Sequence, residues 1–192
     1  SRSSAASDVY KRQAKAKQLL AEAGYPNGFT ITLNTPNDRY VNDEAIATAV
    51  AGFLGRIGIK TEVSARPIAM HSVSLTKADS DFYLYGWGVP TYDSAYIFDF
   101  LVHTRGKDSR GAQNATHYSN ADVDAKILSL SSESDKAKRD ATIKSIWETV
   151  QKERFYIALH DQVIHFASVP RINVPVHPDN ALHFKFVKFE KK

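Results

Sequence analysis

The chain has 192 residues, a formal net charge of +4 and no cysteine. The lack of cysteine excludes disulfides, thiolate metal sites and cysteine nucleophiles. No apolar run reaches the roughly 18 residues that a membrane-spanning helix needs. With 43% hydrophobic and 24% charged residues, the composition indicates an ordinary globular chain of one domain or slightly more.

The basic residues are spread along the sequence rather than gathered into one block. Short basic groups occur at residues 11–17, 136–139 and 185–192. We interpret them as solvated helix faces and a charged end, which is what short charge runs usually are. A basic nucleic-acid-binding domain stays open as an alternative, because positive charge is the first requirement of such a domain.

The first predicted helix has clear stop signals at its end. Ser7 and Asp8 are candidate N-caps, and the helix runs to residue 23 and stops at Gly24. Residues 1–6 contain neither a Met nor an apolar leader segment, so we expect a tag-like or disordered, processed or recombinant start. Alternating apolar residues then predict a strand over 28–35.

A second helix and strand follow in the pattern of a βαβ unit. The helix begins at a cap, Asn42, and ends at Gly58, and residues 59–65 alternate as a strand should. Two strands joined by a helix are expected to be parallel. Apolar residues at i, i+4, i+7, i+8 and i+11 form the buried stripe of this helix: Ile46, Val50, Phe53, Leu54 and Ile57.

The rest of the chain continues the mixture of helices and strands. We predict helices over 68–77, 94–103, 122–130 and 135–153, and strands over 81–87, 156–160 and 162–168. Trp147 lies on the apolar stripe of the longest helix, so we expect it in the core. The predicted fold class is therefore α/β, with a mixed β-sheet flanked by helices.

The C-terminal segment is unusually apolar for a chain end. Residues 170–179 contain three prolines that break any regular element. Residues 182–190 then read as a strand with apolar side chains on both faces. Such a strand needs cover on both sides, so we expect that part of the molecule that packs on it is missing.

Several motifs, in this order, resemble landmarks of the second lobe of family 5 solute-binding proteins, the binding subunits of peptide, nickel and related ABC importers. The first is Leu-Leu-x-Glu-Ala-Gly-Tyr-Pro-x-Gly-Phe at residues 19–29. The resemblance covers roughly residues 8–190. The later landmarks are Arg39-Tyr40-x-Asn42-Asp43, Leu54-x-x-Ile57-Gly58-Ile59, Gly86-Trp87-Gly88 ahead of Asp93, Asn114-x-x-x-Tyr118-Ser119-Asn120 with Asp124, Arg139 and His160.

This resemblance implies a type II periplasmic-binding-protein-like lobe. Residues 7–180 would form the C-terminal lobe, and 181–192 a strand returning to a missing N-terminal lobe. The implied function is capture of a small solute between two lobes and its delivery to an ABC permease in the inner membrane. The implied location is the periplasm, or a membrane-tethered extracytoplasmic position. No catalysis, cofactor, metal or nucleic acid is implied.

Candidate ligand residues come from two loops that follow predicted strands, because ligands bind beyond the carboxyl ends of strands in open α/β sheets. These loops, 35–42 and 86–93, should line the same rim. An indole offers a stacking wall, an aspartate can bind an ammonium group, and an arginine can bind a carboxylate bidentately. The candidates are Arg39, Tyr40, Asn42, Trp87, Gly88, Thr91, Tyr92 and Asp93.

Each candidate also has a purely structural interpretation. Trp87 can cap the core at the end of a buried strand, and Asp93 can cap the helix that follows it. Asn42 is favoured as a helix cap, and Arg39 as a solvated loop residue. Pro90 stands where peptide binders of the family carry an ammonium-binding aspartate, so a sugar, an opine, a glutathione-like compound or another small solute stays open beside peptides.

An α/β enzyme domain is the remaining alternative class. The sequence has no H-E-x-x-H, G-x-S-x-G, G-x-x-x-x-G-K-[ST] or G-x-G-x-x-G motif. His160 and His165 lie on neighbouring predicted strands. We interpret them as packed or hydrogen-bonded histidines rather than metal ligands, because no acidic cluster accompanies them. We therefore predict no catalytic residue.

Overall fold

The computed structural model describes residues 2–77, 79–80, 82–163, 165–177 and 182–189, with side chains in the first helix from Arg12 onward. The chain divides into two compact units, Ser1–Gly86 and Trp87–Lys192. Among the described helices, none is long and apolar enough to span a membrane.

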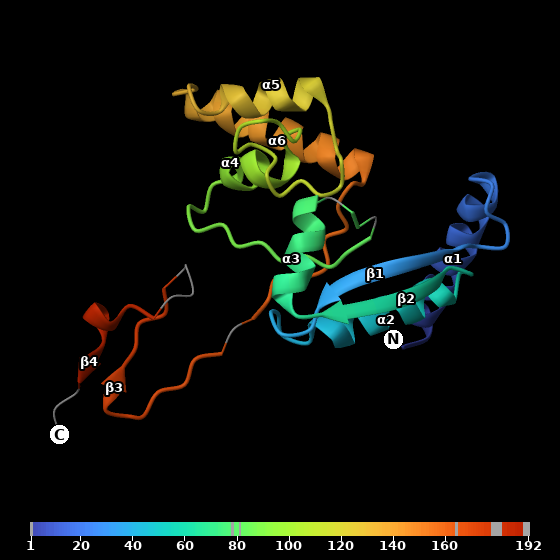
Figure 1. The fold of residues 1–192 in the computed structure, drawn as a ribbon, viewed down its shortest axis with the longest axis horizontal. Coiled ribbons are helices and arrows are strands. Elements are labelled where there is room, and N and C mark those ends of the chain that lie inside the picture. Colours follow the sequence, from blue (N-terminus) through green and yellow to red (C-terminus); the bar gives the residue numbers. More distant parts are fainter. Residues whose placement is uncertain (1, 78, 81, 164, 178–181, 190–192) are drawn as a thin grey trace. The chain divides into compact units, whose positions relative to one another are not determined.

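The first unit is built on a βαβ core. Its elements are α1 (Arg2–Glu22), β1 (Thr30–Pro36), α2 (Asp43–Gly55), β2 (Lys60–Arg66) and α3 (Ile68–Lys77). The two strands are parallel and in register over their whole length, from Thr30 opposite Lys60 to Pro36 opposite Arg66. The predicted parallel pair is confirmed, and α2 runs along one face of it (Figure 1).

Two boundaries in this unit differ from the prediction. The first helix begins at Arg2, so Ser7 and Asp8 lie inside it and do not cap it. Residues 2–6 contain no glycine or proline to stop the helix from extending to the start of the chain. The first strand begins at Thr30 rather than residue 28, because Gly28 has a φ of 71° and leaves the extended conformation.

Gly28 is also a point of close backbone contact. A Cβ atom at this residue would lie 1.9 Å from the carbonyl oxygen of Gly58, which itself has a φ of 99°. These two glycines let the turn before β1 pack directly on the turn before β2. The motif Gly-Tyr-Pro-x-Gly therefore has a packing role here.

The predicted strand over 81–87 forms only one bridge, between Asn34 and Tyr83, within the described residues. Asn34 donates its N–H to the Phe82 carbonyl and accepts from the Leu84 N–H, at 3.0 and 2.9 Å. Beyond this bridge, a side chain rather than a neighbouring strand binds the backbone of this segment: His71 Nε2 donates to the Leu84 carbonyl at 3.0 Å. The predicted strand was thus too long, and residue 81 lies outside the described residues.

The second unit contains a helical cluster. Its elements are α4 (Ser94–Ile97), a π-helix η1 (Phe98–Val102), α5 (Ala121–Ser129) and α6 (Lys136–Glu153). The predicted helix over 94–103 is therefore one α-helical turn followed by a π-helical turn. Figure 1 shows α5 and α6 side by side. The buried core is formed by Phe98, Val102, Val123, Ile127, Leu130, Ile146 and Val150.

Local signals in this cluster agree with the prediction. Asp135 caps α6 by accepting from the N–H groups of Ala137 and Lys138. Asn120 does the same for α5, which begins at Ala121, one residue before the predicted start. Trp147 packs against the core as expected, with its ring centroid 4.8 Å from that of Phe98.

The predicted strands over 156–160 and 162–168 are wrong: the described residues there form no regular element. Ile157 and Val163 stay 73% and 70% exposed, so no neighbouring strand buries the apolar face that predicted them. Residue 164 lies outside the described residues.

A short antiparallel pair closes the chain. β3 (Ile172–Asn173) pairs with β4 (Lys188–Phe189), and a 3-10 turn η2 (Phe184–Phe186) precedes β4. The predicted strand over 182–190 thus covers only two strand residues among those described; residues 181 and 190–192 lie outside. We predicted residues 170–179 to be irregular because they contain three prolines. β3 nevertheless forms there, between Pro170 and Pro175, where the sequence has no proline.

Candidate functional site

The first candidate loop, predicted over 35–42, begins at residue 37 because β1 extends to Pro36, and the carboxylate of Asp43 holds it in place. Asp43 is 4% exposed and accepts from the N–H groups of Arg39 (3.1 Å), Tyr40 (3.0 Å) and Glu44 (2.9 Å). Burial alone would raise the pKa of Asp43, but these backbone hydrogen bonds outweigh it and hold that pKa below its ordinary value. Asp43 therefore shapes the loop as an ionised acceptor.

The predicted capping role of Asn42 is wrong. Asn42 occupies the position before α2 with a φ of 59°, and its side chain makes no capping hydrogen bond. The Asp43 carboxylate accepts from one N–H of the first turn, that of Glu44, and its other two hydrogen bonds go to the loop before the helix. The left-handed backbone at Asn42 explains why asparagine is acceptable there, since this residue tolerates that conformation better than most.

Tyr40 joins this loop to the end of the Phe82–Gly86 segment. Its hydroxyl donates to the Gly86 carbonyl at 3.1 Å, and a Cβ atom on Gly86 would lie 2.8 Å from the Tyr40 ring. Burial raises the pKa of Tyr40. Burial also raises the pKa of neighbouring Tyr85 to about 12, with a contribution from Tyr40. Gly86 is thus required for the ring to approach the backbone.

Arg39 carries a positive charge that no acid among the described residues pairs with. Its guanidinium lies 5.7 Å from the Tyr40 ring centroid, and it forms no ion pair with a described residue. Asp38, beside it in sequence, accepts from the N–H of Ile68 at 2.7 Å and so caps α3. The loop therefore presents a cation on an aromatic support.

The second candidate loop begins with an aromatic trio, which we define as Trp87, Tyr96 and Phe100. The Trp87 centroid lies 6.1 Å from that of Tyr96 and 5.8 Å from that of Phe100, and the latter two rings are 5.0 Å apart. All three side chains are half-buried. Trp87 is therefore packed on neighbouring rings and is also partly open, which fits both interpretations of this residue.

Asp93 is engaged twice within its own unit. Its Oδ1 accepts from the N–H of Ala95 at 2.9 Å, which confirms the predicted cap of the helix after it. Arg139 Nη2 lies 2.8 Å from Oδ2 and 2.9 Å from Oδ1. Hydrogen bonding from Arg139, and then from Ala95, lowers the pKa of Asp93. The sequence had marked Arg139 only as part of a motif, without a partner.

The remaining candidates of this loop lie at its surface. Tyr92 is 71% exposed and has a φ of 53°. Thr91 accepts from the N–H of Asp93 through its hydroxyl at 3.3 Å. Gly88 is exposed, with open space where a side chain would stand. These three residues are accessible to a ligand and are not fixed by the core.

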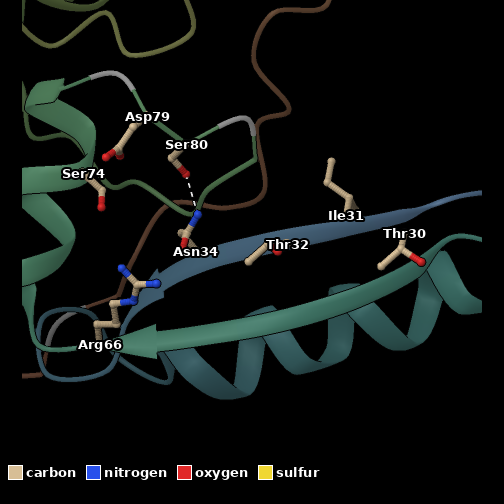
Figure 2. Close-up of a pocket in the computed structure, with 8 residues that line it drawn as sticks. All are labelled: Thr30, Ile31, Thr32, Asn34, Arg66, Ser74, Asp79 and Ser80. Atoms are coloured by element: carbon tan, nitrogen blue, oxygen red, sulfur yellow. Dashed lines mark hydrogen bonds between the residues drawn. The ribbon is translucent and has the colours of Figure 1, made fainter.

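Sequence reasoning missed a polar cavity of about 530 Å³ beside β1. Figure 2 shows it above the outer edge of β1, where Asn34 donates to Ser80 Oγ at 2.7 Å. The alternate polar residues of β1 were the available signal. None of the predicted ligand residues lines this cavity, which is bounded by Thr30, Ile31, Thr32, Asn34, Arg66, Ser74, Asp79 and Ser80.

Comparison with solved structures defines the class of fold. The periplasmic binding protein DppA from Helicobacter pylori, solved in complex with the peptide STSA, superposes with a TM-score of 0.76 at 21% sequence identity. The superposition covers 93% of this chain and 34% of that one. The α/β fold of this chain is thus that of a lobe of a periplasmic binding protein.

Sequence comparison defines the family. The model of the bacterial extracellular solute-binding proteins, family 5 (middle region), matches residues 2–109. The chain belongs to this family.

Two curated relatives show how much of a family member the chain covers. Glutathione-binding protein GsiB of Pectobacterium atrosepticum is 25% identical over 179 residues, 90% of this chain and 34% of that protein. Heme-binding protein A of Haemophilus influenzae is 28% identical over 135 residues, 65% of this chain and 23% of that protein. The chain therefore spans about a third of the first relative and about a quarter of the second.

Proposed function

We propose that this chain is the ligand-capturing lobe of an extracytoplasmic solute-binding protein that serves an ABC importer. The observation that carries the proposal is the family match over residues 2–109. That span includes both candidate loops, so the residues proposed to touch the solute lie within the part that defines the family. The named relatives are binding proteins for glutathione and heme, and the role proposed here is binding for transport, without catalysis or a cofactor.

The proposed partners follow from the share of the relatives that this chain covers. At 34% of the length of GsiB, it supplies one wall of a cleft, and we propose that an N-terminal lobe supplies the other. Phe184 and Phe189, which are 79% and 78% exposed, support such a lobe as the cover of the C-terminal segment. The proposed setting is the periplasm or the outer face of a membrane, with an ABC permease as the receiver.

The charges of the two loops support a narrower ligand class. The acids are already engaged: Asp38 caps α3, Asp43 binds three backbone N–H groups and Asp93 is paired with Arg139. Pro90 supplies no charge and no N–H. Arg39 remains as a cation without an ion pair among the described residues. We propose a carboxylate-bearing solute whose amino group, if present, is not required.

The role of Trp87 and its loop belongs to the same proposal. Half-burial on Tyr96 and Phe100 fixes the indole in place, and a fixed aromatic ring binds a flat or apolar group without losing side-chain freedom. Gly88, Thr91 and Tyr92 are proposed as adaptable surface contacts, and Arg39 and Tyr40 as the carboxylate side of the site.

A matched set of ligands tests both the proposed binding function and the proposed ligand class on the two-lobed protein. Calorimetry is performed with a dipeptide, its N-acetyl form and its N-acetyl amide. We expect the dipeptide and its N-acetyl form to bind equally, because the acids of the two loops are already engaged and do not bind the ammonium group. The amide should bind at least tenfold more weakly, because it lacks the carboxylate proposed to bind Arg39. Arg39→Gln should remove the difference between acid and amide. Arg56→Gln, a surface arginine over the Phe53 ring, is the matched control and should leave it unchanged.

The outcomes separate the function from the ligand class. A free dipeptide that binds tenfold more tightly than its N-acetyl form would contradict the ligand class but support the binding function. Failure of peptides, glutathione, opines, sugars and heme to bind would contradict the function. A salt-sensitive shift of random DNA would favour the nucleic-acid-binding alternative.

A further inference from the structure

The aromatic trio of the second candidate loop rests on a π-helical turn. Phe100, which forms the trio with Trp87 and Tyr96, lies in the π-helix η1. Two residues earlier in the same turn, Phe98 is fully buried and packs on Trp147, with 4.8 Å between the ring centroids. The turn therefore connects the core of the second unit to the trio that contains Trp87, the proposed ligand wall.

A π-helical turn is uncommon, and its end needs hydrogen-bond partners. Every helix leaves its last carbonyl groups without partners inside the helix, and π-helical turns occur mostly singly, often at functional sites. In η1 the Phe98 carbonyl accepts from the His103 N–H at 2.9 Å, which closes the turn. His103 then leaves the helical conformation, with a ψ of 140°. The carbonyls after Phe98 must therefore be bonded from elsewhere in the chain.

The loop between η1 and α5 supplies two of these partners. The N–H of Gly111 donates to the Asp99 carbonyl at 2.7 Å, and the N–H of Gln113 donates to the Phe100 carbonyl at 3.0 Å. The backbone of Phe100 is thus fixed through its own carbonyl and through the one before it. The position of the Phe100 ring against Trp87 depends on a loop that lies more than ten residues further along the chain.

Gly111 is the residue at which this loop comes closest to the end of η1. It is buried and has a φ of 62°, and a Cβ atom there would overlap the His103 carbonyl oxygen and lie 2.8 Å from Cα of Arg105. Both are backbone atoms, so no side chain can rotate away to make room. Asn114, which is 1% exposed, ties the loop to the same place, because its Nδ2 donates to the His103 carbonyl at 3.0 Å. A side chain at residue 111 would therefore displace the loop from η1.

We propose that Gly111 is a positioning residue for the ligand wall: it lets the loop bind the end of η1, which holds Phe100 against Trp87. The inference rests on the proposed role of Trp87 in solute binding. A half-buried indole keeps one orientation only while the rings beside it stay in place, and Phe100 lies 5.8 Å from Trp87 between centroids. If Phe100 moved, Trp87 would gain side-chain freedom, and a solute that binds to it would have to remove that freedom again.

The first test needs no solute and uses the 192-residue chain. In a Trp147→Phe background Trp87 is the remaining indole, since the chain has two tryptophans. Gly111→Ala should shift the Trp87 emission to the red and raise its quenching by acrylamide about twofold, because an unsupported ring gains access to water. Gly106→Ala is the matched control and should change neither. Gly106 is an exposed glycine of the same loop, and its Cβ would first meet the carboxylate of Asp108, at 3.2 Å.

A milder variant keeps the test decisive if melting curves show that Gly111→Ala unfolds the chain. Tyr156→Phe removes the hydroxyl that donates to the Leu101 carbonyl of η1 at 3.0 Å. It should shift the Trp87 emission in the same direction as Gly111→Ala, by a smaller amount. Unchanged emission and quenching in a folded Gly111→Ala variant would overturn the proposal. If that variant does not fold, unchanged emission in Tyr156→Phe would overturn it.

The second test measures the effect on solute binding in the two-lobed protein. Gly111→Ala should weaken binding about tenfold, and most of this loss should disappear in a Trp87→Ala background, because the two residues act through the same ring. The ratio of affinities for a carboxylate and its amide, which reports on Arg39, should stay unchanged, whereas a general loss of structure would alter it. Equal losses in the two backgrounds would overturn the proposal. If no solute binds at all, the proposed function fails, while the fluorescence of the isolated chain still decides whether Gly111 positions Trp87.

Discussion

Asp93 and Arg139 lie 46 residues apart in the sequence and form an ion pair with 2.8 Å between Nη2 and Oδ2. The same carboxylate caps α4 through the Ala95 N–H. Asp93 therefore fastens the end of the second candidate loop to the start of α6, and its charge is occupied within the lobe. This pairing leaves Asp93 poorly suited to hold the ammonium group of a ligand.

Separating the two roles of Asp93 is the first prediction. Asp93→Asn keeps an oxygen for the Ala95 N–H but loses the ion pair, whereas Asp93→Ala loses both. We expect a loss of about 0.5 kcal/mol for Asn, because the pair is partly exposed and screened, and about 1–2 kcal/mol for Ala, because the cap is lost too. Urea denaturation measures both. Equal losses would contradict the separate capping contribution.

Asp93 should also contribute to acid sensitivity. Its folded pKa lies below the ordinary value of 3.8, so its stabilisation is complete above that value and is lost as the pH falls through the folded pKa. The difference in unfolding free energy between the wild type and Arg139→Gln should therefore shrink below about pH 4. A difference that stays constant down to pH 2 would show that Asp93 is not the titrating partner.

His71 provides a second pH-dependent contribution, at a higher pH. It is 1% exposed and its Nε2 donates to Leu84, and burial lowers its pKa from 6.5. The unfolded chain binds the proton more readily, so the unfolding free energy should fall as the pH drops below about 6.5 and level off once the folded pKa is passed. His71→Gln should flatten this slope. His117→Gln, at an exposed histidine, should not.

The contact between Tyr40 and Gly86 can be tested by a double-mutant cycle. Tyr40→Phe removes the hydroxyl bond to the Gly86 carbonyl and should cost about 0.5–1.5 kcal/mol of stability. Gly86→Ala should cost more, because its Cβ would lie 2.8 Å from the ring. In a Tyr40→Ala background this second substitution should become nearly neutral. Additive losses in denaturation experiments would contradict the contact.

The elements that the sequence predicted well are those set by local chemistry. Asp135 and Asn120 cap helices with their own side chains, and the bounds of α3 follow from its apolar spacing. The strands over 156–168 could not be predicted correctly in the same way. A strand needs a partner for its hydrogen bonds and cover for its apolar face, and the alternation of Ile157 and Leu159 says nothing about whether either is available.

In the candidate site, too, features set by local sequence could be predicted and features set by distant residues could not. The positions of both loops follow from strand order, and the capping by Asp93 follows from its place before a helix. The partner of Asp93 could not be predicted, because Arg139 is distant in sequence and nothing in the sequence distinguishes it from the other arginines as a partner. Asp43 entered the sequence analysis only as part of a motif, and the left-handed backbone of Asn42, whose side chain makes no capping hydrogen bond, leaves no pattern in the sequence.

The two tryptophans should respond differently to substitution. Trp147 packs on Phe98 and donates its indole N–H to Ser94, so Trp147→Ala should cost about 3 kcal/mol or more of stability. Trp87→Ala should cost less stability but weaken solute binding at least tenfold if it forms the ligand wall. Fluorescence of Trp147→Phe, whose remaining indole is Trp87, should change on ligand binding. An unchanged signal and unchanged affinity would assign Trp87 to packing alone.

The last prediction concerns the lobe in isolation. Burial of most of a small ligand needs walls on both sides, and this chain covers 34% of GsiB. We expect the 192-residue chain alone to bind the carboxylate-bearing solute at least a hundredfold more weakly than the two-lobed protein, because the proposed opposite wall is absent. Arg39→Gln should lower even this residual affinity, while Arg56→Gln should not. Calorimetry on the isolated chain decides the question: equal affinity in the two forms would place the whole binding site within this lobe.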